Sequence, residues 1–399
     1  MALESGNPPY LFLKRMSPDA AKIAREDEVV FGLEPKVSAK VDRMLLNPDK
    51  AWQPSDLLPS FEKPDWIEDV VKLRTMAAGL SKGLVVATAG NGITEEGAPL
   101  YARALERIPT FSEPSGKGLN GFGRWGLGWD SEENRHKIVF DRWMWLSGRV
   151  DMKAYDTTVH HFIANGFGGR IGQSVYNALI FTSHQEPATK ISHERDALLA
   201  RSQGDEYLHR ISLRTSGEEA RHGEFYGWLY GEVFDADPNG AVVAAEQMFD
   251  LDKGGILMPG ALMSDKKVKN VDGIAQTELF QDYSLVTQAL GIYTAADYND
   301  ITRSLLTRWR VFDRTFDTPE AREAQERLGK FTVTYGKVLE RAMSMKVSSR
   351  FSTPPSFSWI HDEPVPLHTL KEEVAELKRF QESRKTVKPE TQNTEPAGS

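Results

Sequence analysis

The sequence of 399 residues contains no cysteine. This absence excludes disulfides, thiolate nucleophiles and iron–sulfur clusters, so any redox chemistry must use a bound metal or cofactor. The chain also lacks an apolar run of about 18 or more residues, which a membrane-spanning helix would need. Residues 1–25 contain no apolar core followed by a cleavage site. We therefore expect a soluble protein in a reducing compartment, outside the membrane.

Positive charge is the scarcer of the two signs. Lys and Arg number 49 against 57 Asp and Glu, which gives a formal net charge of −8. This balance argues against a nucleic-acid partner, although it leaves room for local basic patches. The length is ample for one large core. We expect an N-terminal extension of irregular and short helical pieces at 1–60 and a main domain at 61–345. A C-terminal tail at 346–399 would hold one amphipathic helix and a disordered end.

Helical patterns dominate the main domain and strand signals are weak, so the expected fold class is all-α. We expect one helix over residues 83–107. A glycine-rich loop over residues 116–128 is expected to lead into the next helix. Pro187 lies inside a helical stretch at residues 174–200, where a proline removes a hydrogen bond and can kink the helix.

Two segments in helical stretches repeat one pattern. Glu132–His136 and Glu218–His222 each contain Glu-x-x-His, and residues three apart share a helix face. A single glutamate, Glu95, precedes the first segment, and another, Glu186, lies between the two. This order matches the ligand set of a ferritin-like di-metal bundle, in which two helices each give one Glu and two give Glu-x-x-His.

Charge supports a metal at this set. Four carboxylates buried together would repel and desolvate each other at a cost of many kcal/mol. Two divalent cations would neutralise them while both imidazoles stay neutral. Oxygen-rich ligation with one imidazole per metal suits iron or manganese better than zinc. The candidate metal ligands are Glu95, Glu133, His136, Glu186, Glu219 and His222.

Two alternatives weaken the pattern. A third Glu-x-x-His, Glu206–His209, begins 13 residues before Glu219. At about 100° per residue it lies about 140° away from the Glu219 face, and we interpret it as a solvated pair. The two repeated segments could also be exposed helix faces rich in ion pairs.

Further segments carry a resemblance to a known family. Together with the two repeated segments, they are similar to the soluble acyl-acyl-carrier-protein desaturases of plastids and some bacteria. The resemblance extends over roughly residues 30–315, in order and with few gaps. The segments are Trp52–Pro59, Ile93–Glu96, Leu146–Met152, Thr182–Glu186, Ile191–His193, Asp235–Gly240, Met258–Pro259 and Leu290–Tyr298.

The resemblance implies a homodimeric, ferritin-like, all-helical enzyme with two irons per subunit. Such an enzyme removes two hydrogens from an acyl chain carried on acyl carrier protein, using O2 and two electrons from ferredoxin. Carried over by resemblance, Glu133 and Glu219 would bridge the irons, and Thr189 would help to handle the oxygen intermediate. Trp52 and Glu218 would lie on the electron path, although the family usually has Asp where Glu218 stands.

Holding one bond of a flexible acyl chain beside the metals requires a narrow apolar tunnel. Some of the candidate lining residues lie on the ligand-bearing helix faces. Others stand where this sequence departs from the plant enzymes, and for that reason the resemblance fixes neither the chain length nor the double-bond position. His184 also departs, since an aromatic residue is usual there. The tunnel candidates are Ala98, Ala102, Ala104, Leu105, Arg107, Ile108, Ala178, Leu179 and Thr182.

Acyl carrier protein and ferredoxin are both strongly acidic, so this acidic chain would need a local patch of basic residues to bind them. Residues 264–269 are one candidate, and Lys190 with Arg195 and Arg201 is another. The compartment would be the cytoplasm of a bacterium or the plastid stroma of a plant or alga. The competing interpretations are another ferritin-like oxygenase, an iron-storage protein of about half this length, and a homologue that has lost a ligand.

Overall fold

The computed structural model describes residues 20–106, 108, 110–112, 117–166, 174–250, 255–256, 258–266, 277–370 and 372–375. Over these residues the fold is all-α, as the sequence predicts, apart from one two-residue pair of strands. The elements are α1 (Ala20–Phe31), α2 (Glu34–Met44), α3 (Pro54–Leu57), α4 (Trp66–Ala78), α5 (Lys82–Glu95), α6 (Ala98–Glu106), α7 (Gly121–Ser147), α8 (Met152–Asn165), α9 (Val175–Ser202), α10 (Glu206–Ala236), α11 (Pro238–Phe249), η5 (Pro259–Leu262), α12 (Glu278–Leu290), α13 (Ala295–Arg308), η6 (Val311–Asp313), α14 (Pro319–Lys330), η7 (Phe331–Tyr335), α15 (Gly336–Ser349), β1 (Ser356–Phe357), η8 (Ser358–Ile360) and β2 (Glu363–Pro364).

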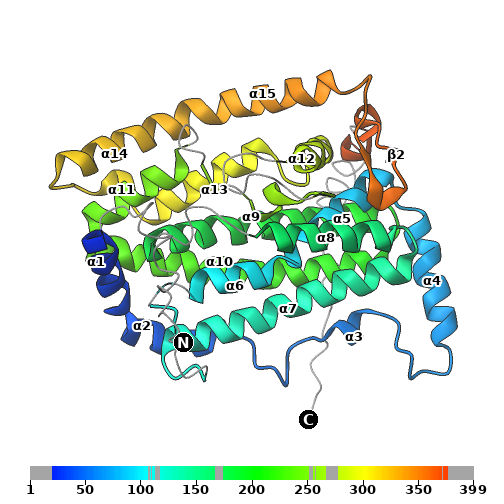
Figure 1. Ribbon diagram of the computed structural model, residues 1–399, viewed down its shortest axis with the longest axis horizontal. Coiled ribbons are helices and arrows are strands. Elements are labelled where there is room, and N and C mark those ends of the chain that lie inside the picture. The colour runs from blue at the N-terminus through cyan, green and yellow to red at the C-terminus, as the bar shows by residue number, and fades with distance from the viewer. Residues whose placement is uncertain are drawn as a thin grey trace, which may run out of the picture.

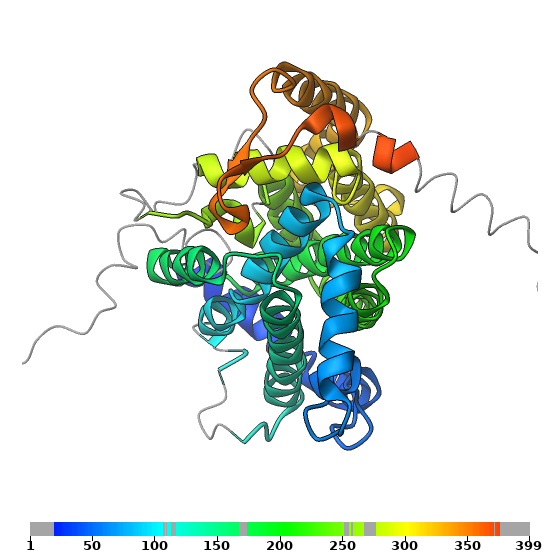
Figure 2. The same ribbon diagram turned by 90° about the vertical axis from the view of Figure 1, so that its right-hand side faces the viewer.

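Four helices form the centre of the fold. α5 contacts α7 and α9, and α10 contacts the same two helices, so the four close into a ferritin-like bundle. α8 packs on α5, and α1 and α2 pack at one end of the bundle (Figure 1). α12 covers α5 and α13 covers α9, and α15 lies over both of these outer helices. Figure 2 shows this layering end-on, with α15 at the top of the molecule.

α7 begins earlier than the sequence predicts, and the expected glycine-rich loop is wrong beyond residue 120. The side chain of Asn120 caps the helix by accepting a hydrogen bond from the Gly123 amide at 2.7 Å. The glycines serve close packing of α2 on α7: a Cβ on Gly121 would lie 2.6 Å from the Ser38 amide nitrogen, and one on Gly128 would lie 2.3 Å from Leu45. The glycines that suggested a loop are therefore contact residues of a helix.

The expected single helix over residues 83–107 is also wrong, because it is two helices. α5 ends at Glu95 and α6 begins at Ala98. Pro99 has no N–H to donate to the Glu95 carbonyl, so one hydrogen bond of a continuous helix is missing where α5 gives way to α6. By contrast, α9 runs from Val175 to Ser202 without a break despite Pro187.

The C-terminal segment packs on the main body. Phe357, Trp359, Leu367 and Leu370 are buried in the same apolar cluster as α4, α5 and α8. The Trp359 indole donates a hydrogen bond to the hydroxyl of Thr158 on α8 at 2.8 Å. Residues 367–370 and 372–375 are helical, and the rest of the predicted amphipathic helix lies outside the described residues. The division of the chain at residues 60 and 345 stays a prediction.

Two apolar clusters fill the interior. One contains Trp125, Tyr226 and the residues of α1, α11 and α14 that pack around them. The other contains Leu84, Val139 and parts of α8 and α12. Buried carboxylates and imidazoles of the four central helices belong to neither cluster. Within the described residues, no helix is both long and apolar enough to cross a membrane.

Candidate metal centre

The six predicted ligands converge from the four central helices. α5 carries Glu95, α9 carries Glu186, and α7 and α10 each carry a Glu-x-x-His pair. Their ligand atoms form two groups, within each of which every atom lies within 4.8 Å of the others. The groups are Glu95, Glu133, His136 and Glu219, and Glu133, Glu186, Glu219 and His222. Glu133 and Glu219 belong to both groups, which is the arrangement that two bridging carboxylates require.

Both imidazoles direct Nδ1 toward the carboxylates. Nδ1 of His136 lies 3.0 Å from Oε1 of Glu219 and 3.3 Å from Oε2 of Glu133. Nδ1 of His222 lies 2.9 Å from Oε1 of Glu133 and 3.5 Å from Oε2 of Glu186. Both histidines are fully buried, and the four carboxylates are at most 7% exposed. The centre is therefore enclosed by protein.

The Nε2 atom of each imidazole contacts a carboxylate from the other Glu-x-x-His helix. Nε2 of His136 on α7 lies 2.9 Å from Oε2 of Glu218 on α10. Nε2 of His222 on α10 lies 2.9 Å from Oε2 of Glu132 on α7. A carboxylate on Nε2 fixes the tautomer that leaves the Nδ1 lone pair free for a metal. Sequence reasoning missed this role of Glu132, because the double glutamate of each repeated segment shows the position but not its partner on the other helix.

Two arginines complete the crossed arrangement. Arg135 on α7 donates to both carboxylate oxygens of Glu218 at 2.9 Å. Arg221 on α10 pairs with Glu132. The two supporting carboxylates therefore have cationic partners of their own, and the negative charge they add near the centre is compensated.

Other buried side chains orient the remaining ligands. The Trp129 indole donates to Oε1 of Glu186 at 3.1 Å, and Nε2 of His193 lies 2.8 Å from Oε1 of Glu95. Thr189 donates to Oε2 of Glu219 at 2.8 Å, which places the predicted catalytic threonine against a shared carboxylate.

The residues fit a pair of cations. Oε1 of Glu133, Nδ1 of His136, Oε2 of Glu186 and Nδ1 of His222 are fully buried, and no protein group forms a hydrogen bond to them. Buried polar atoms are nearly always satisfied, so four such atoms pointing into one space indicate ligands. Carboxylate oxygens and imidazoles are the donor set that suits iron or manganese.

Burial and the charges of neighbouring side chains shift the pKa values of these ligands. Burial raises the pKa of Glu186 well above its usual range, and the charge of Glu219 raises it further. Burial lowers the pKa of His136, but the charge of Glu133, together with the Glu218 carboxylate on Nε2, outweighs burial and raises it well above the usual value. Protons on the imidazoles thus balance the carboxylates, and divalent cations would displace them.

A hydrogen-bonded line connects the centre to Trp52, a half-buried side chain before α3. The Trp52 indole donates to Oε1 of Glu218 at 2.7 Å, and Glu218 in turn contacts His136. The Trp52 and His136 rings stack with centroids 6.3 Å apart and planes 6° apart. The two residues predicted for an electron path are therefore in contact with each other and with a candidate ligand.

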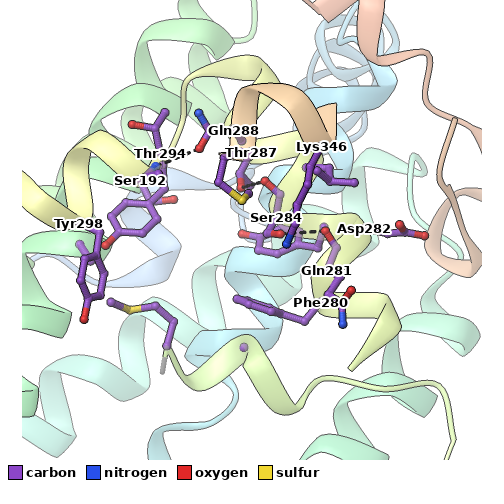
Figure 3. Close-up of a pocket in the computed structure, with 18 of the residues that line it drawn as sticks. Ser192, Phe280, Gln281, Asp282, Ser284, Thr287, Gln288, Thr294, Tyr298 and Lys346 are labelled. Atoms are coloured by element: carbon purple, nitrogen blue, oxygen red, sulfur yellow. Dashed lines mark hydrogen bonds between the residues drawn. The ribbon is translucent and has the colours of Figure 1, made fainter. Parts of the chain in front are cut away.

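A cavity of about 490 Å³ lies beside the centre (Figure 3). Its wall includes Thr189, which bonds Glu219, and Thr94, which is the residue before Glu95. It extends between α12 and α15 to Lys346 and Arg350. Its lining mixes apolar side chains with a few polar groups, as ligand cavities usually do.

A second cavity, of about 330 Å³, lies on another side of the centre. Trp129, which donates to Glu186, forms part of its wall together with Trp125 and Tyr226. Leu105 and Phe111 line it from the segment at and after α6. Space beside the metal ligands is thus available in two directions.

Comparison with known proteins assigns the family. The family described as "Fatty acid desaturase" matches residues 25–361. The chain belongs to the fatty acid desaturase family. This match extends 16 residues past residue 345, the end of the expected main domain, because it ends at residue 361.

Curated relatives share about a third of the residues of this desaturase. "Acyl-[acyl-carrier-protein] desaturase 4, chloroplastic" of Oryza sativa subsp. japonica is 35% identical, covering 88% of this chain and 84% of the relative. "Stearoyl-[acyl-carrier-protein] 9-desaturase, chloroplastic" of Olea europaea is 35% identical, covering 81% and 80%. "Acyl-[acyl-carrier-protein] 6-desaturase" of Thunbergia alata is 36% identical, covering 78% and 77%. Because the 9- and 6-desaturases are equally similar, overall identity does not select a double-bond position.

The predicted tunnel residues of the desaturase fall into three groups. Leu105 lines the second cavity. Five others are buried in the core and line neither cavity; they are Ala104, Ile108, Ala178, Leu179 and Thr182. Arg107 and the side chains of Ala98 and Ala102 lie outside the described residues.

The third Glu-x-x-His is not a solvated pair, as the sequence analysis expected. Glu206 is exposed, but His209 is 9% exposed and its Nδ1 lies 2.8 Å from the carbonyl oxygen of Ala197. The short connection between α9 and α10 folds the start of α10 against the end of α9 and so buries the imidazole.

Proposed function

We propose that this chain is an acyl-acyl-carrier-protein desaturase. It inserts a cis double bond into a saturated acyl chain, using O2 and two electrons from ferredoxin at a centre of two irons. The convergence of six ligands from four helices, with Glu133 and Glu219 common to both metal groups, carries this proposal. The family membership and the acyl-carrier-protein desaturases among its relatives support the substrate class.

In the proposed reaction, bound iron supplies the oxidant that an unactivated C–H bond requires and that no side chain provides. The four glutamates and two histidines hold the metals, and Glu132 and Glu218 hold the imidazoles. Burial excludes bulk water from the oxidising centre, which suppresses side reactions.

The larger cavity receives the acyl chain in this proposal. Thr94, Thr189 and Ser192 form the wall next to the ligands, so a chain lying along it would present one C–C bond to the metals. Thr189 donates its hydroxyl hydrogen to Glu219 and so places its oxygen on the cavity wall beside a shared carboxylate. Positioning of this kind accounts for much of the rate when the substrate is flexible.

Electrons would enter through Trp52. Its indole is hydrogen-bonded to Glu218, which contacts His136, so this line joins the half-buried Trp52 to a candidate ligand. We further propose a homodimer in the plastid stroma of a plant or alga, or in the cytoplasm of a bacterium.

The decisive test is purified protein with iron, reduced ferredoxin, O2 and a ladder of acyl-carrier-protein thioesters, with double bonds located by mass spectrometry. Glu219→Ala is expected to reduce iron uptake by at least one equivalent and to abolish product, because Glu219 serves both metals. Glu206→Ala, an exposed glutamate on the same helix, is the matched control and should retain both. Full product formation by Glu219→Ala would refute the assignment.

A further inference from the structure

Residues 327–350 carry a local charge opposite to that of the whole molecule. The segment contains six cationic residues and one acidic residue, Glu340. Its net charge is therefore +5, in a chain of net charge −8. The six are Arg327, Lys330, Lys337, Arg341, Lys346 and Arg350.

Most of these charges are not used to hold the fold together. Arg327 pairs with Glu246, and Arg350 pairs with Asp282 at 3.0 Å. The other four have no ion-pair partner among the described residues. By contrast, Arg195 is fully engaged, because it binds Asp297 through two nitrogens. Three of these four, Lys337, Arg341 and Lys346, lie on α15. Unpaired cations gathered on one helix of an acidic protein favour an acidic partner.

The same element forms the outer wall of the larger cavity. Four residues of α15 and the position just after it line the cavity: Leu339, Met343, Lys346 and Arg350. They follow one another at spacings of four, three and four residues. This spacing is one helix stripe, and it changes from apolar to cationic along its length. Figure 3 shows Lys346 on the side of the cavity formed by Gln281, Asp282 and Ser284, away from Thr294 and Tyr298.

The outward face of α15 is partly apolar. Val338 is 59% exposed and Met345 is 65% exposed, and both lie on the stripe that also contains the exposed Ala342. Lys337 and Arg341 flank this stripe. Apolar side chains bordered by charge are the usual composition of a protein interface with a polar rim.

We propose that the α15 face (Lys337, Val338, Arg341, Met345 and Lys346) docks the acidic carrier protein that delivers the acyl chain. This inference rests on the proposed function. The cationic residues attract the acidic carrier, and Val338 and Met345 supply the apolar contact. The acyl thioester then enters the larger cavity past Lys346, because α15 is both the docking element and the wall of the cavity.

The position of Trp52 separates this partner from ferredoxin. Trp52 precedes α3, and α3 and α15 lie on opposite sides of the molecule in both Figure 1 and Figure 2. A donor of electrons to Trp52 would not cover the α15 face. The basic patch around Lys190 and Arg195, which the sequence suggested, is a weaker docking candidate. Lys190 pairs with Glu194, and Arg195 pairs with Asp297.

The test reverses the charge of the α15 face in the full-length, iron-loaded enzyme. Binding of fluorescently labelled octadecanoyl-carrier protein is followed by anisotropy, which needs no turnover. Lys337→Glu with Arg341→Glu is expected to weaken binding by about tenfold or more, and Lys346→Glu alone by about threefold or more. The KM for the carrier thioester should rise more than kcat falls.

The matched control is Lys72→Glu with Lys153→Glu, which makes the same change of net charge at exposed positions on α4 and α8. It should bind the carrier within about twofold of wild type. The docking proposal is overturned if the α15 reversal binds like wild type, or if it weakens ferredoxin binding instead. Wild-type enzyme that binds the carrier but yields no product contradicts the proposed function while leaving the docking result intact.

Discussion

Glu132 and Glu218 each stand one position before a shared ligand, yet each serves the imidazole of the other helix. Glu132 on α7 holds His222, and Glu218 on α10 holds His136. The arrangement ties the two Glu-x-x-His helices together at the level of the metals. It also makes the affinity of each metal depend on a side chain that does not touch it.

Glu132→Gln is expected to weaken metal binding at the His222 group by about 10- to 100-fold. The amide keeps the shape of the side chain but loses the charge that orients and polarises the imidazole. Titration of the metal-free protein with Fe(II) under anaerobic conditions measures the change. Glu96→Gln is the control, because Glu96 is a buried neighbour of Glu95 that pairs with Lys137. Equal weakening in both variants would show that the effect is not specific to the imidazole.

His184 is a buried imidazole that belongs to neither metal group. Burial lowers its pKa to about 4, against a smaller opposing effect of the Tyr298 carbonyl oxygen 3.3 Å from Nε2. Its ring lies 4.5 Å from that of Tyr298 and 5.9 Å from that of Phe249, so it packs as an aromatic side chain. This packing explains how histidine is accommodated where the family resemblance led us to expect an aromatic residue.

The lowered pKa of His184 predicts a pH dependence of stability. As pH falls from about 6.5 to about 4, the unfolded chain binds a proton on His184 while the folded protein does not. The free energy of unfolding therefore falls across this window, by about 3 kcal/mol from this residue alone. Urea unfolding of His184→Phe at pH 7 and pH 4.5 should show a smaller loss than wild type. An unchanged loss, with exposed His160→Phe as control, would contradict the prediction.

The ligands could be predicted from sequence because their geometry is local. Three residues along a helix place Glu133 and His136 on one face whatever the rest of the chain does. The role of Glu132 could not be predicted in this way. It depends on the rotation and height of α10 relative to α7, and no local pattern encodes that relation.

At the scale of elements, the structural role of a glycine depended on which helix packs against it. The sequence before Trp129 suggested a loop, but the glycines at 121 and 128 let α2 approach α7. Composition alone cannot distinguish a glycine that frees a turn from one that admits a neighbouring helix. The neighbour had to be known before the helix could be recognised.

Gly90 on α5 is a second contact glycine and gives a test of this interpretation. A Cβ there would lie 2.1 Å from the ring of Tyr283 on α12, which must move. Because the Tyr283 hydroxyl also donates to Asn91 at 2.7 Å, Gly90→Ala is expected to lower stability by about 1–3 kcal/mol. Gly217→Ala on α10 is the control: a Cβ there meets nothing within 4 Å, and helix propensity should raise stability by about 1 kcal/mol. Chemical denaturation of both variants decides the matter, and destabilisation by both would count against close packing as the cause.

At the scale of the whole molecule, the metal centre lies among helices that also carry both apolar clusters. Trp125 and Tyr226 belong to one cluster, and Leu84 and Val139 to the other. The metal ligands on α7 and α10 are the polar groups that lie between these two apolar clusters. Metal removal leaves four buried carboxylates with only the protonated imidazoles to balance them, so the loss of stability should extend across the bundle rather than stay in one loop.

Metal-free protein is therefore expected to unfold at a lower temperature than the iron-loaded form. With each metal present at about 100 times its dissociation constant, binding adds about 2.7 kcal/mol per site, or about 5 kcal/mol for two. For a chain of 399 residues this corresponds to a Tm shift of about 6 °C. Calorimetry before and after chelation measures the shift. Hydrogen exchange should show where it arises: α5, α7, α9 and α10 should lose protection near their ligands, while α14 and α15 should change little. Equal loss of protection in α15 would mean that the docking element is coupled to the metals, and an unchanged Tm would mean that the six side chains do not hold metal at all.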